Sequence, residues 1–200
     1  MGLGVVGSGV ATALLDQSDA ISEKVGRRIN LKKVLVRDAG KPRDSGIPAG
    51  LITTNPEEIL ADPGIQILAE VIGGTDPATR YLKDALSAGK HVVTANKEVL
   101  AKSGPELMSL AKQNGVSLLF EASVGGGIPI VGCLMNQLLA NDIQSVQGII
   151  NGTTNYILTR MAQAHTSFPQ ALQEAQELGY AETDPTNDIE GIDAVYKLSI

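Results

Sequence analysis

The sequence predicts an α/β fold, in which a doubly wound parallel sheet is followed by part of a second, α+β domain. Short apolar runs alternate with helix-compatible stretches along the first part of the chain, which is the pattern of strands joined by crossover helices. A glycine-rich motif stands at the start of the first helix-compatible stretch. The alternation changes after Ile128, so we expect one domain at residues 1–127 and another at residues 128–200.

The glycine-rich motif, Gly2 to Gly7, reads G-x-G-x-x-G and leads into an apolar, helix-compatible run over residues 8–15. In this pattern the first glycine permits a tight turn, the second lets the backbone approach a pyrophosphate, and the third lets the helix pack on the sheet. The helix dipole and the free N–H groups at the helix start hold the phosphate charge. An ordinary glycine-rich turn is the other interpretation, since the chain has 22 glycines. If the motif belongs to a Rossmann-type domain, we expect it to bind a dinucleotide. The residues expected to contact the dinucleotide are Gly2, Leu3, Gly4, Val5, Val6 and Gly7.

Only Met1 precedes this motif, although a Rossmann-type fold places a buried strand there. We therefore expect the sequence to lack the first strand of the fold. At the other end, residues 194–200 indicate a helix that has no stop signal.

The remaining elements follow from apolar runs and turn residues. In the first domain we expect strands at residues 32–36, 65–72, 91–94 and 116–120. We expect helices that start at Pro56 and that cover residues 78–88 and 105–114. In the second domain we expect a helix at 129–139, a strand at 143–150, a polar turn at 151–155, and helices at 156–164 and 168–178.

Arg37 and Asp38 stand at the end of the strand at 32–36, where a Rossmann-type fold meets the adenosine ribose. An acid there accepts a hydrogen bond from the 2′-hydroxyl of NAD, whereas an arginine accommodates the 2′-phosphate of NADP. Lys41 and Arg43 add positive charge nearby, or are simply a solvated charge cluster. We favour NADP, bound through Arg37, and keep NAD as an alternative.

Two further strand ends indicate ligand contacts, because open α/β sheets bind ligands beyond the carboxyl ends of their strands. The strand at 65–72 runs into a glycine pair, so Gly74 and Thr75 are expected to contact the cofactor. Lys97 follows the strand at 91–94 and is expected on the nicotinamide side. On position alone, a solvated lysine at the start of a helix explains Lys97 equally well.

An acid-rich loop over residues 179–190 leads into a helix that carries Asp193 and Lys197. Residues at this i,i+4 spacing share one helix face, and a surface ion pair there contributes roughly a few tenths of a kcal/mol. Such a pair is the ordinary interpretation. The rest of the helix is apolar, however, which predicts that it is largely buried and that Lys197 is a usable proton donor.

The composition argues against several classes of protein. The net charge is −6, aromatic residues make up 3% and tryptophan is absent, so nucleic acid and anionic membranes are not expected as partners. Cys133 is the single cysteine, which fits a reducing, cytoplasmic location and a core residue rather than a nucleophile. The two histidines are isolated and do not indicate a zinc site. No apolar run reaches the roughly 18 residues of a membrane span.

Seven blocks of sequence together resemble the homoserine dehydrogenase family. They run in the order of the family over essentially the whole chain, and the last four are far more specific than a glycine motif. The blocks are GLGVVGSGV, VLVRD, VIGGTDPA, GKHVVTANKE, EASVGGGIPI, GIINGTTNYIL and GYAETDPTNDIEGIDAVYK.

The resemblance implies that the protein interconverts L-aspartate 4-semialdehyde and L-homoserine with a nicotinamide cofactor, on the route to threonine, methionine and isoleucine. It implies that Lys197 is the proton donor and that Lys97 is a second catalytic residue near the nicotinamide. It also implies that Glu182 and Asp193 hold the amino acid substrate and that Gly179 contacts the cofactor through its backbone.

The resemblance further implies a sodium ion, held mainly by backbone carbonyl oxygens of the EASVGGGIPI loop. The second domain is then the first part of a domain that serves catalysis and dimerisation, so a homodimer is expected of the intact protein. The implied sodium ligands are Glu121, Val124, Gly126 and Ile128.

Two other functions stay open at this point. One is a Rossmann-type oxidoreductase that acts on another semialdehyde or amino acid. The other is a nucleotide-binding module without turnover, such as a decayed copy. The joint presence of Lys97, Glu182, Asp193 and Lys197 argues against the module, because loss of function would release those positions.

Overall fold

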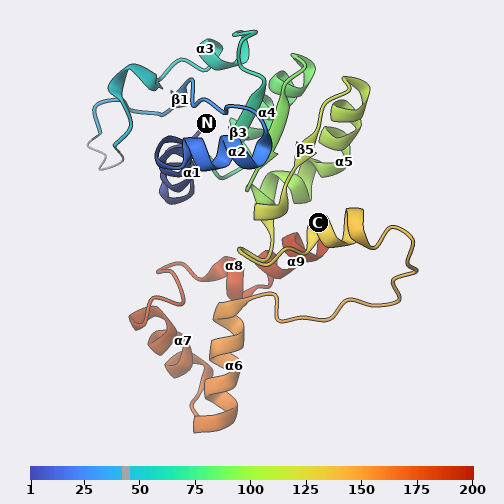
Figure 1. Ribbon diagram of the computed structural model, residues 1–200. Coiled ribbons are helices and arrows are strands. Elements are labelled where there is room, and N and C mark those ends of the chain that lie inside the picture. Colours follow the sequence, from blue (N-terminus) through green and yellow to red (C-terminus); the bar gives the residue numbers. More distant parts are fainter. Residues whose placement is uncertain (42–45) are drawn as a thin grey trace. The chain divides into compact units, whose positions relative to one another are not determined.

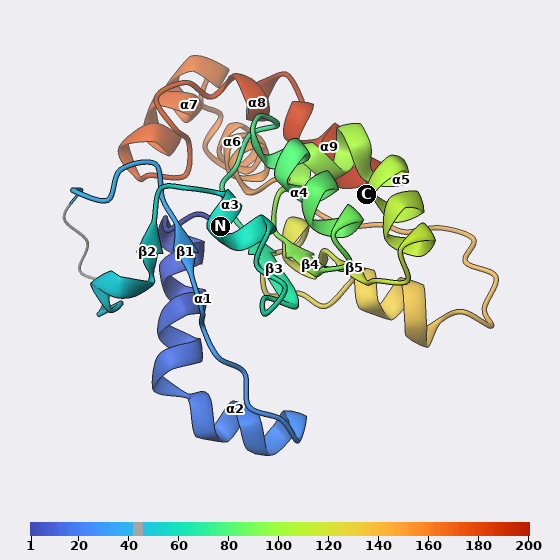
Figure 2. The same ribbon diagram turned by 90° about the horizontal axis from the view of Figure 1, so that it is seen from above.

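The computed structural model describes residues 1–41 and 46–200, so Arg43 lies outside the described residues. These residues form two compact units, Met1–Gly126 and Gly127–Ile200, which Figures 1 and 2 show from two directions. Within the two described ranges, no helix is both long enough and apolar enough to cross a bilayer.

The first unit contains parallel strands, as the alternating sequence predicts. One sheet has the order β3 (Ile67–Glu70), β4 (His91–Thr94) and β5 (Leu118–Leu119), and these strands lie side by side in Figure 2. A second parallel pair joins β1 (Val34–Leu35) to β2 (Ile52–Thr53). The predicted α/β class with a parallel sheet is therefore confirmed.

The backbone of Met1 and Gly2 joins the two sets of strands. The Met1 nitrogen donates to the Ala69 carbonyl oxygen at 2.5 Å, and the Met1 carbonyl oxygen accepts from the Val71 nitrogen at 3.0 Å. On the other side, the Gly2 nitrogen donates to the Leu35 carbonyl oxygen at 3.0 Å. Met1 thus lies between β1 and β3, at the place where we expected the first strand of the fold.

The helices of the first unit cover this sheet and close its core. α4 and α5 pack against each other, α4 also packs against β3 and β4, and α5 packs against β5. Leu82 and Leu86 of α4, Leu107 of α5 and Val92 of β4 are fully buried, and each such side chain contributes about 1.5–3 kcal/mol by leaving water. The helices are α1 (Val5–Asp16), α2 (Ser18–Val25), α3 (Glu57–Leu60), α4 (Ala78–Ser87) and α5 (Lys97–Gln113).

α5 begins at Lys97, whereas Pro105 was expected to open it. The Asn96 side chain caps the helix by accepting from the Val99 nitrogen at 3.2 Å, and Pro105 lies inside the helix. A proline inside a helix removes one backbone hydrogen bond. Burial of the helix face that carries Val99 and Leu107, both fully buried, compensates for that loss.

The regular secondary structure of the second unit is helical throughout its described residues. α6 and α7 pack together around Ile157, Ala171 and Ala175, and the Arg160 Nε donates to Glu174 at 2.9 Å between the two helices. The helices are α6 (Gly152–Ala164), α7 (Phe168–Glu177), α8 (Thr186–Ile189) and α9 (Ile192–Ser199).

The segment before α6 differs from the expectation. Its helix is shorter than the expected 129–139 and contains a π-helical turn at Cys133–Gln137. The strand expected at 143–150 is wrong: Val146 and Ile149 are 66% and 77% exposed, and the segment is an extended loop in Figure 1. A strand needs a hydrogen-bonded neighbour, and the described residues of this unit contain none.

Candidate functional site

The glycine motif lies where the backbone passes from the sheet into α1. Gly2 has a φ of +93°, and a Cβ there would lie 2.6 Å from the Val71 carbonyl oxygen. A Cβ on Gly7 would lie 2.3 Å from the Gly2 carbonyl oxygen. Gly4 has nothing within 4 Å of the position of a Cβ, so its surroundings are open. Two glycines are therefore required by backbone contacts, and the third leaves space for a ligand at the start of α1.

The carboxyl ends of β1 and β3 carry the other residues predicted to contact a dinucleotide. Arg37 is exposed, two residues after the end of β1. Gly73 and Gly74 follow β3 with φ values of +84° and +71°, which favour glycine. The Gly74 carbonyl oxygen accepts from the Asn96 side chain at 2.8 Å, and Thr75 is half-buried beside it. This bond ties the glycine pair to the start of α5.

Lys97 is the first residue of α5 and is partly buried. Its neighbour Asn96 is buried and holds both the loop after β3 and the first turn of α5. The structure thus places Lys97 and the glycine pair at the same edge of the sheet, because β3 and β4 are parallel and adjacent.

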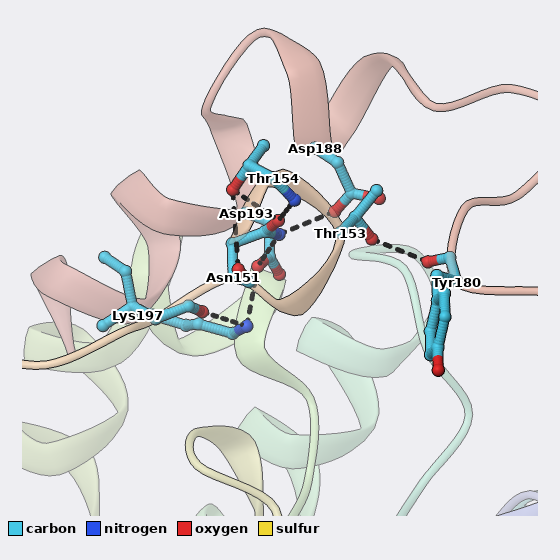
Figure 3. A network of polar contacts seen from close by, with 8 residues as sticks. Asn151, Thr153, Thr154, Tyr180, Asp188, Asp193 and Lys197 are labelled. Carbon is cyan, nitrogen blue, oxygen red and sulfur yellow. Dashed lines mark hydrogen bonds and ion pairs between the residues drawn. The ribbon is translucent and has the colours of Figure 1, made fainter. Parts of the chain in front are cut away.

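The second unit holds a polar network centred on Asn151, the N-cap of α6 (Figure 3). The Asn151 Nδ2 donates to the Oδ1 of Asp188 and to the Oδ2 of Asp193, both at 2.8 Å. The Asn151 Oδ1 accepts from the nitrogen and the hydroxyl of Thr154, at 2.8 and 2.9 Å. All four hydrogen-bonding positions of this amide are used, so the orientation of its plane is determined.

Lys197 and Asp193 of α9 form the predicted i,i+4 pair, with 2.7 Å between Nζ and Oδ2. The Lys197 Nζ also donates to the Ile150 carbonyl oxygen at 2.6 Å. The side chains of Lys197 and Asp193 are 25% and 9% exposed. The pair is therefore largely withdrawn from water and connected to Asn151, unlike an ordinary surface ion pair.

Asn151 and Asp188 were not among the predicted site residues. A signal for Asn151 was present, because an asparagine directly before a helix is a preferred N-cap. Asp188 belongs to the acid-rich loop, and its contact with Asn151 spans 37 residues of sequence. The short helix α8, which places Asp188, was read only as loop.

Gly179 and Glu182 follow α7 and differ in their surroundings. Gly179 has a φ of +77°, and the carbonyl oxygen of the next residue, Tyr180, accepts from the Thr153 hydroxyl at 2.7 Å. Glu182 is exposed, and its carbonyl oxygen accepts from the Gln176 side chain at 3.1 Å. The network drawn in Figure 3 does not include the Glu182 carboxylate.

The four residues implied as sodium ligands fall in both units. Glu121, Val124 and Gly126 end the first unit, and Ile128 lies in the second. Glu121 is partly buried and Val124 is buried, while Gly126 and Ile128 are exposed. Across the described parts of the chain, no group of three or more His, Cys, Asp or Glu side chains could hold a metal ion. A site of carbonyl oxygens is of another kind, so that finding does not bear on it.

The parallel strands, the turn at Gly2 and the open space at Gly4 define the first unit as a dinucleotide-binding domain. The second unit adds a buried carboxylate–lysine pair. Two family models match the two units separately: "Homoserine dehydrogenase, NAD binding domain" matches residues 2–121, and "Homoserine dehydrogenase" matches residues 129–200. The chain belongs to the homoserine dehydrogenase family.

Individual relatives agree with this assignment. The homoserine dehydrogenase of Bacillus subtilis strain 168 is 46% identical over 200 residues, which are 100% of this chain and 46% of the relative. The crystal structure of a homoserine dehydrogenase from Thiobacillus denitrificans is similar with a TM-score of 0.90 and 47% identity, over 98% of this chain and 46% of that chain. A hyperthermophilic archaeal homoserine dehydrogenase in complex with NADPH has a TM-score of 0.76 and 29% identity, over 99% of this chain and 66% of that chain. The chain therefore spans about half the length of the curated relatives it matches.

Proposed function

We propose that this protein is an NADP-dependent homoserine dehydrogenase, which interconverts L-aspartate 4-semialdehyde and L-homoserine in the biosynthesis of threonine, methionine and isoleucine. The observation that carries the proposal is the withdrawn Lys197–Asp193 pair, in a chain whose other unit has the glycine motif. The archaeal relative bound to NADPH supports the choice of cofactor.

The residues of the first unit fit a dinucleotide. Gly4 leaves open space for a pyrophosphate, and the first N–H groups of α1 have no acceptor within a helix. Arg37, exposed after β1, provides the positive charge that a 2′-phosphate requires, which favours NADP while NAD remains the alternative. When bound, the nicotinamide cofactor supplies or accepts the hydride.

Lys197 is proposed to donate the proton to the carbonyl oxygen of the semialdehyde. Its ammonium group has three hydrogens, and the contacts with Asp193 and Ile150 account for two of them among the described residues. The third is then available to the oxygen on which negative charge develops. Asp193 holds the ammonium in place, and Asn151 holds Asp193.

The other residues are assigned by charge or by their place at the edge of the sheet and in the acid-rich loop. Glu182 and Asp193 are proposed to bind the ammonium group of the amino acid substrate through charge-assisted hydrogen bonds. Lys97, at the start of α5, is proposed to act beside the nicotinamide, and Gly179 to contact the cofactor through its backbone. Gly74 and Thr75 are proposed as further cofactor contacts.

A sodium ion, a homodimer and a cytoplasmic location complete the proposal. The carbonyl oxygens of Glu121, Val124, Gly126 and Ile128 are hard ligands of the kind that such an ion takes. The homodimer is proposed for the intact protein on the resemblance to the family. Support for the reducing cytoplasm comes from Cys133, the single cysteine of the chain, which cannot form an internal disulfide.

The test is homoserine-dependent reduction of NADP by the complete gene product, with a Lys197→Ala variant. Loss of a general acid lowers kcat by about 10²–10⁴-fold, and we expect a fall in this range. Lys102→Ala is the matched control: Lys102 forms an exposed i,i+4 pair with Glu98 at 2.6 Å, and its loss should leave kcat unchanged.

Each other outcome points to a different function. Activity that survives Lys197→Ala would transfer the proton-donor role to Lys97. Turnover of another semialdehyde or alcohol, without turnover of homoserine, would indicate a related oxidoreductase. NADPH binding without turnover of any such substrate would indicate a nucleotide-binding module.

A further inference from the structure

Glu70, the last residue of β3, is a fully buried carboxylate that the proposed chemistry does not use. The register of the parallel pair places it opposite Thr94, the last residue of β4. Both residues therefore lie at the carboxyl edge of the sheet, within the first unit. A buried carboxylate is costly unless its oxygens accept hydrogen bonds, so its contacts indicate its role.

Three donors converge on the two oxygens of Glu70, one from the loop after β3, one from the end of β4 and one from the loop after β4. The Ile72 nitrogen donates to Oε1 at 2.8 Å, and the Asn96 Nδ2 lies 3.4 Å from the same oxygen. The Thr94 hydroxyl donates to Oε2 at 2.7 Å. The carboxylate thus contacts the loop that leaves β3 and the loop that leaves β4.

Thr94 and Asn96 extend these contacts to the residues that follow. The Thr94 hydroxyl accepts from the Asn96 nitrogen at 3.0 Å. The Asn96 side chain donates to the Gly74 carbonyl oxygen at 2.8 Å and accepts from the Val99 nitrogen at 3.2 Å. One buried carboxylate is therefore linked, through at most one intervening side chain, to the Gly73–Gly74 pair and to the first turn of α5.

We propose that Glu70 is a positioning residue for the dinucleotide site, which holds the Gly73–Thr75 loop and the α5 start, with Lys97, in their binding geometry. The inference rests on the proposed function, because those two loops are the proposed contacts with the cofactor. Glu70 is buried away from the surface and acts through Ile72, Thr94 and Asn96.

The chemistry of the contacts favours a carboxylate at this position. Ile72, Thr94 and Asn96 all present donors, and an ionised carboxylate is the side chain that only accepts. In a Glu70→Gln variant, the amide oxygen can still accept from Ile72 and Asn96, but the amide nitrogen faces the Thr94 hydroxyl, which then has to accept and loses its own acceptor. In a Glu70→Asp variant the charge is kept, but the side chain is one methylene shorter and cannot reach both loops with the same geometry.

Lys90 provides a matched control at the opposite edge of the same sheet, directly before the neighbouring strand β4. It is 3% exposed. Its Nζ donates to the carbonyl oxygens of Asp62 and Ile65 at 2.6 and 2.9 Å. A Lys90→Met variant therefore also removes a buried charge bonded to loops, but at the edge of the sheet remote from the glycine pair.

The experiment compares the complete gene product with its Glu70→Gln, Glu70→Asp and Lys90→Met variants. The first readout is amide hydrogen exchange without cofactor at Ile72 to Thr75 and at Lys97 to Val99. The second readout is the dissociation constant of NADPH. A thermal melt identifies any variant that is not folded.

We expect faster exchange in both loops and a dissociation constant for NADPH raised about tenfold or more in Glu70→Gln, which corresponds to the loss of one hydrogen bond to a charged group. Glu70→Asp should fall between Glu70→Gln and the wild type. Lys90→Met should lower the melting temperature and leave the NADPH affinity and the exchange of these two loops unchanged.

A folded Glu70→Gln variant with wild-type exchange in the two loops would overturn the inference, and so would an equal loss of NADPH affinity in Lys90→Met. If Glu70→Gln does not fold, Glu70→Asp and Lys90→Met decide the question by the same two readouts. A wild-type protein that binds no NADPH would refute the proposed function, whereas the exchange rates would still decide whether Glu70 holds the loops.

Discussion

Replacement of Asn151 by serine should destabilise the second unit while it leaves the start of α6 capped. Serine is as good an N-cap as asparagine, so the contact with the Thr154 nitrogen is retained. What serine lacks is the amide nitrogen that donates to Asp188 and Asp193, each at 2.8 Å. The variant therefore isolates the role of Asn151 in holding the two carboxylates.

The magnitude follows from the burial of the two acceptors. A hydrogen bond to a charged group contributes about 1.5–3 kcal/mol. Asp193 is 7% exposed, so water cannot replace its lost partner, whereas Asp188 is only partly buried and can be rehydrated. We therefore expect Asn151→Ser to lower the free energy of unfolding by about 3 kcal/mol. Asn151→Ala also removes the cap and should cost about 1 kcal/mol more.

Urea unfolding followed by tyrosine fluorescence is the assay. Tyr156, Tyr180 and Tyr196 lie in the second unit and only Tyr81 in the first, and the rings of Tyr156 and Tyr180 are 4.8 Å apart. The signal therefore reports mainly on the unit that contains Asn151. Asn155→Ser is the control, because Asn155 is exposed on the same helix, and its effect should be within about 0.5 kcal/mol.

Three results would contradict this reasoning. If Asn151→Ser unfolds at the same urea concentration as the wild type, the amide nitrogen does not hold the carboxylates. If Asn151→Ser and Asn151→Ala are destabilised equally, the cap on α6 does not contribute. An equal loss in Asn155→Ser would show that any serine in this region has the same effect.

Three further predictions concern other parts of the chain. Gly7→Ala should destabilise the first unit by about 1–3 kcal/mol, because the new Cβ would lie 2.3 Å from a backbone oxygen. Gly9→Ala is the control: its Cβ would have no atom within 4 Å, so it should stabilise α1 by about 0.5–1 kcal/mol. Equal urea midpoints for the two variants would contradict this prediction. Arg37→Ala should raise the dissociation constant of NADPH and leave that of NADH unchanged, whereas parallel losses would remove the assigned role in binding the 2′-phosphate. The hydrogen bond from Arg160 holds the pKa of Glu174 below its ordinary value of 4.5, so the pair stabilises the fold above that pH and loses this effect as the pH falls through the lowered pKa. In Arg160→Gln, a carboxyl titration by NMR should show the pKa of Glu174 return toward 4.5. An unchanged titration midpoint would contradict the assignment.

Local patterns predicted much of the first unit. The apolar run at 91–94 coincides with β4, and the helix expected at 78–88 is α4 (Ala78–Ser87). α4 buries a face whose helical period is visible in the sequence, whereas β4 was indicated by its short apolar run alone. The start of α5 was misplaced because Pro105 is a strong local signal for a helix start. The helix instead continues through Pro105, because its buried face packs against the neighbouring sheet, which no local pattern shows.

In the second unit, too, contacts within one helix could be predicted from the sequence, whereas pairing between distant segments could not. The pair of Asp193 and Lys197 is an i,i+4 contact, and this spacing is a property of a single helix. Residues 143–150 have the imperfect alternation of a strand, but a strand forms only where another chain segment pairs with it. No local pattern could show that this partner is absent from the described part of the unit.

Local patterns were enough to predict the α/β class, the turn and helix of the glycine motif, and the lysine–carboxylate pair, because each leaves its signal in residues a few positions apart. The tertiary fold alone brings Asn151 to Asp188 and Asp193, in contacts that span 37 and 42 residues. It also decided that Glu70 meets Thr94 and Asn96 across β3 and β4, at separations of 24 and 26 residues. Such bonds form only after the packing of apolar faces has brought distant segments together, and no local pattern encodes which polar groups then meet.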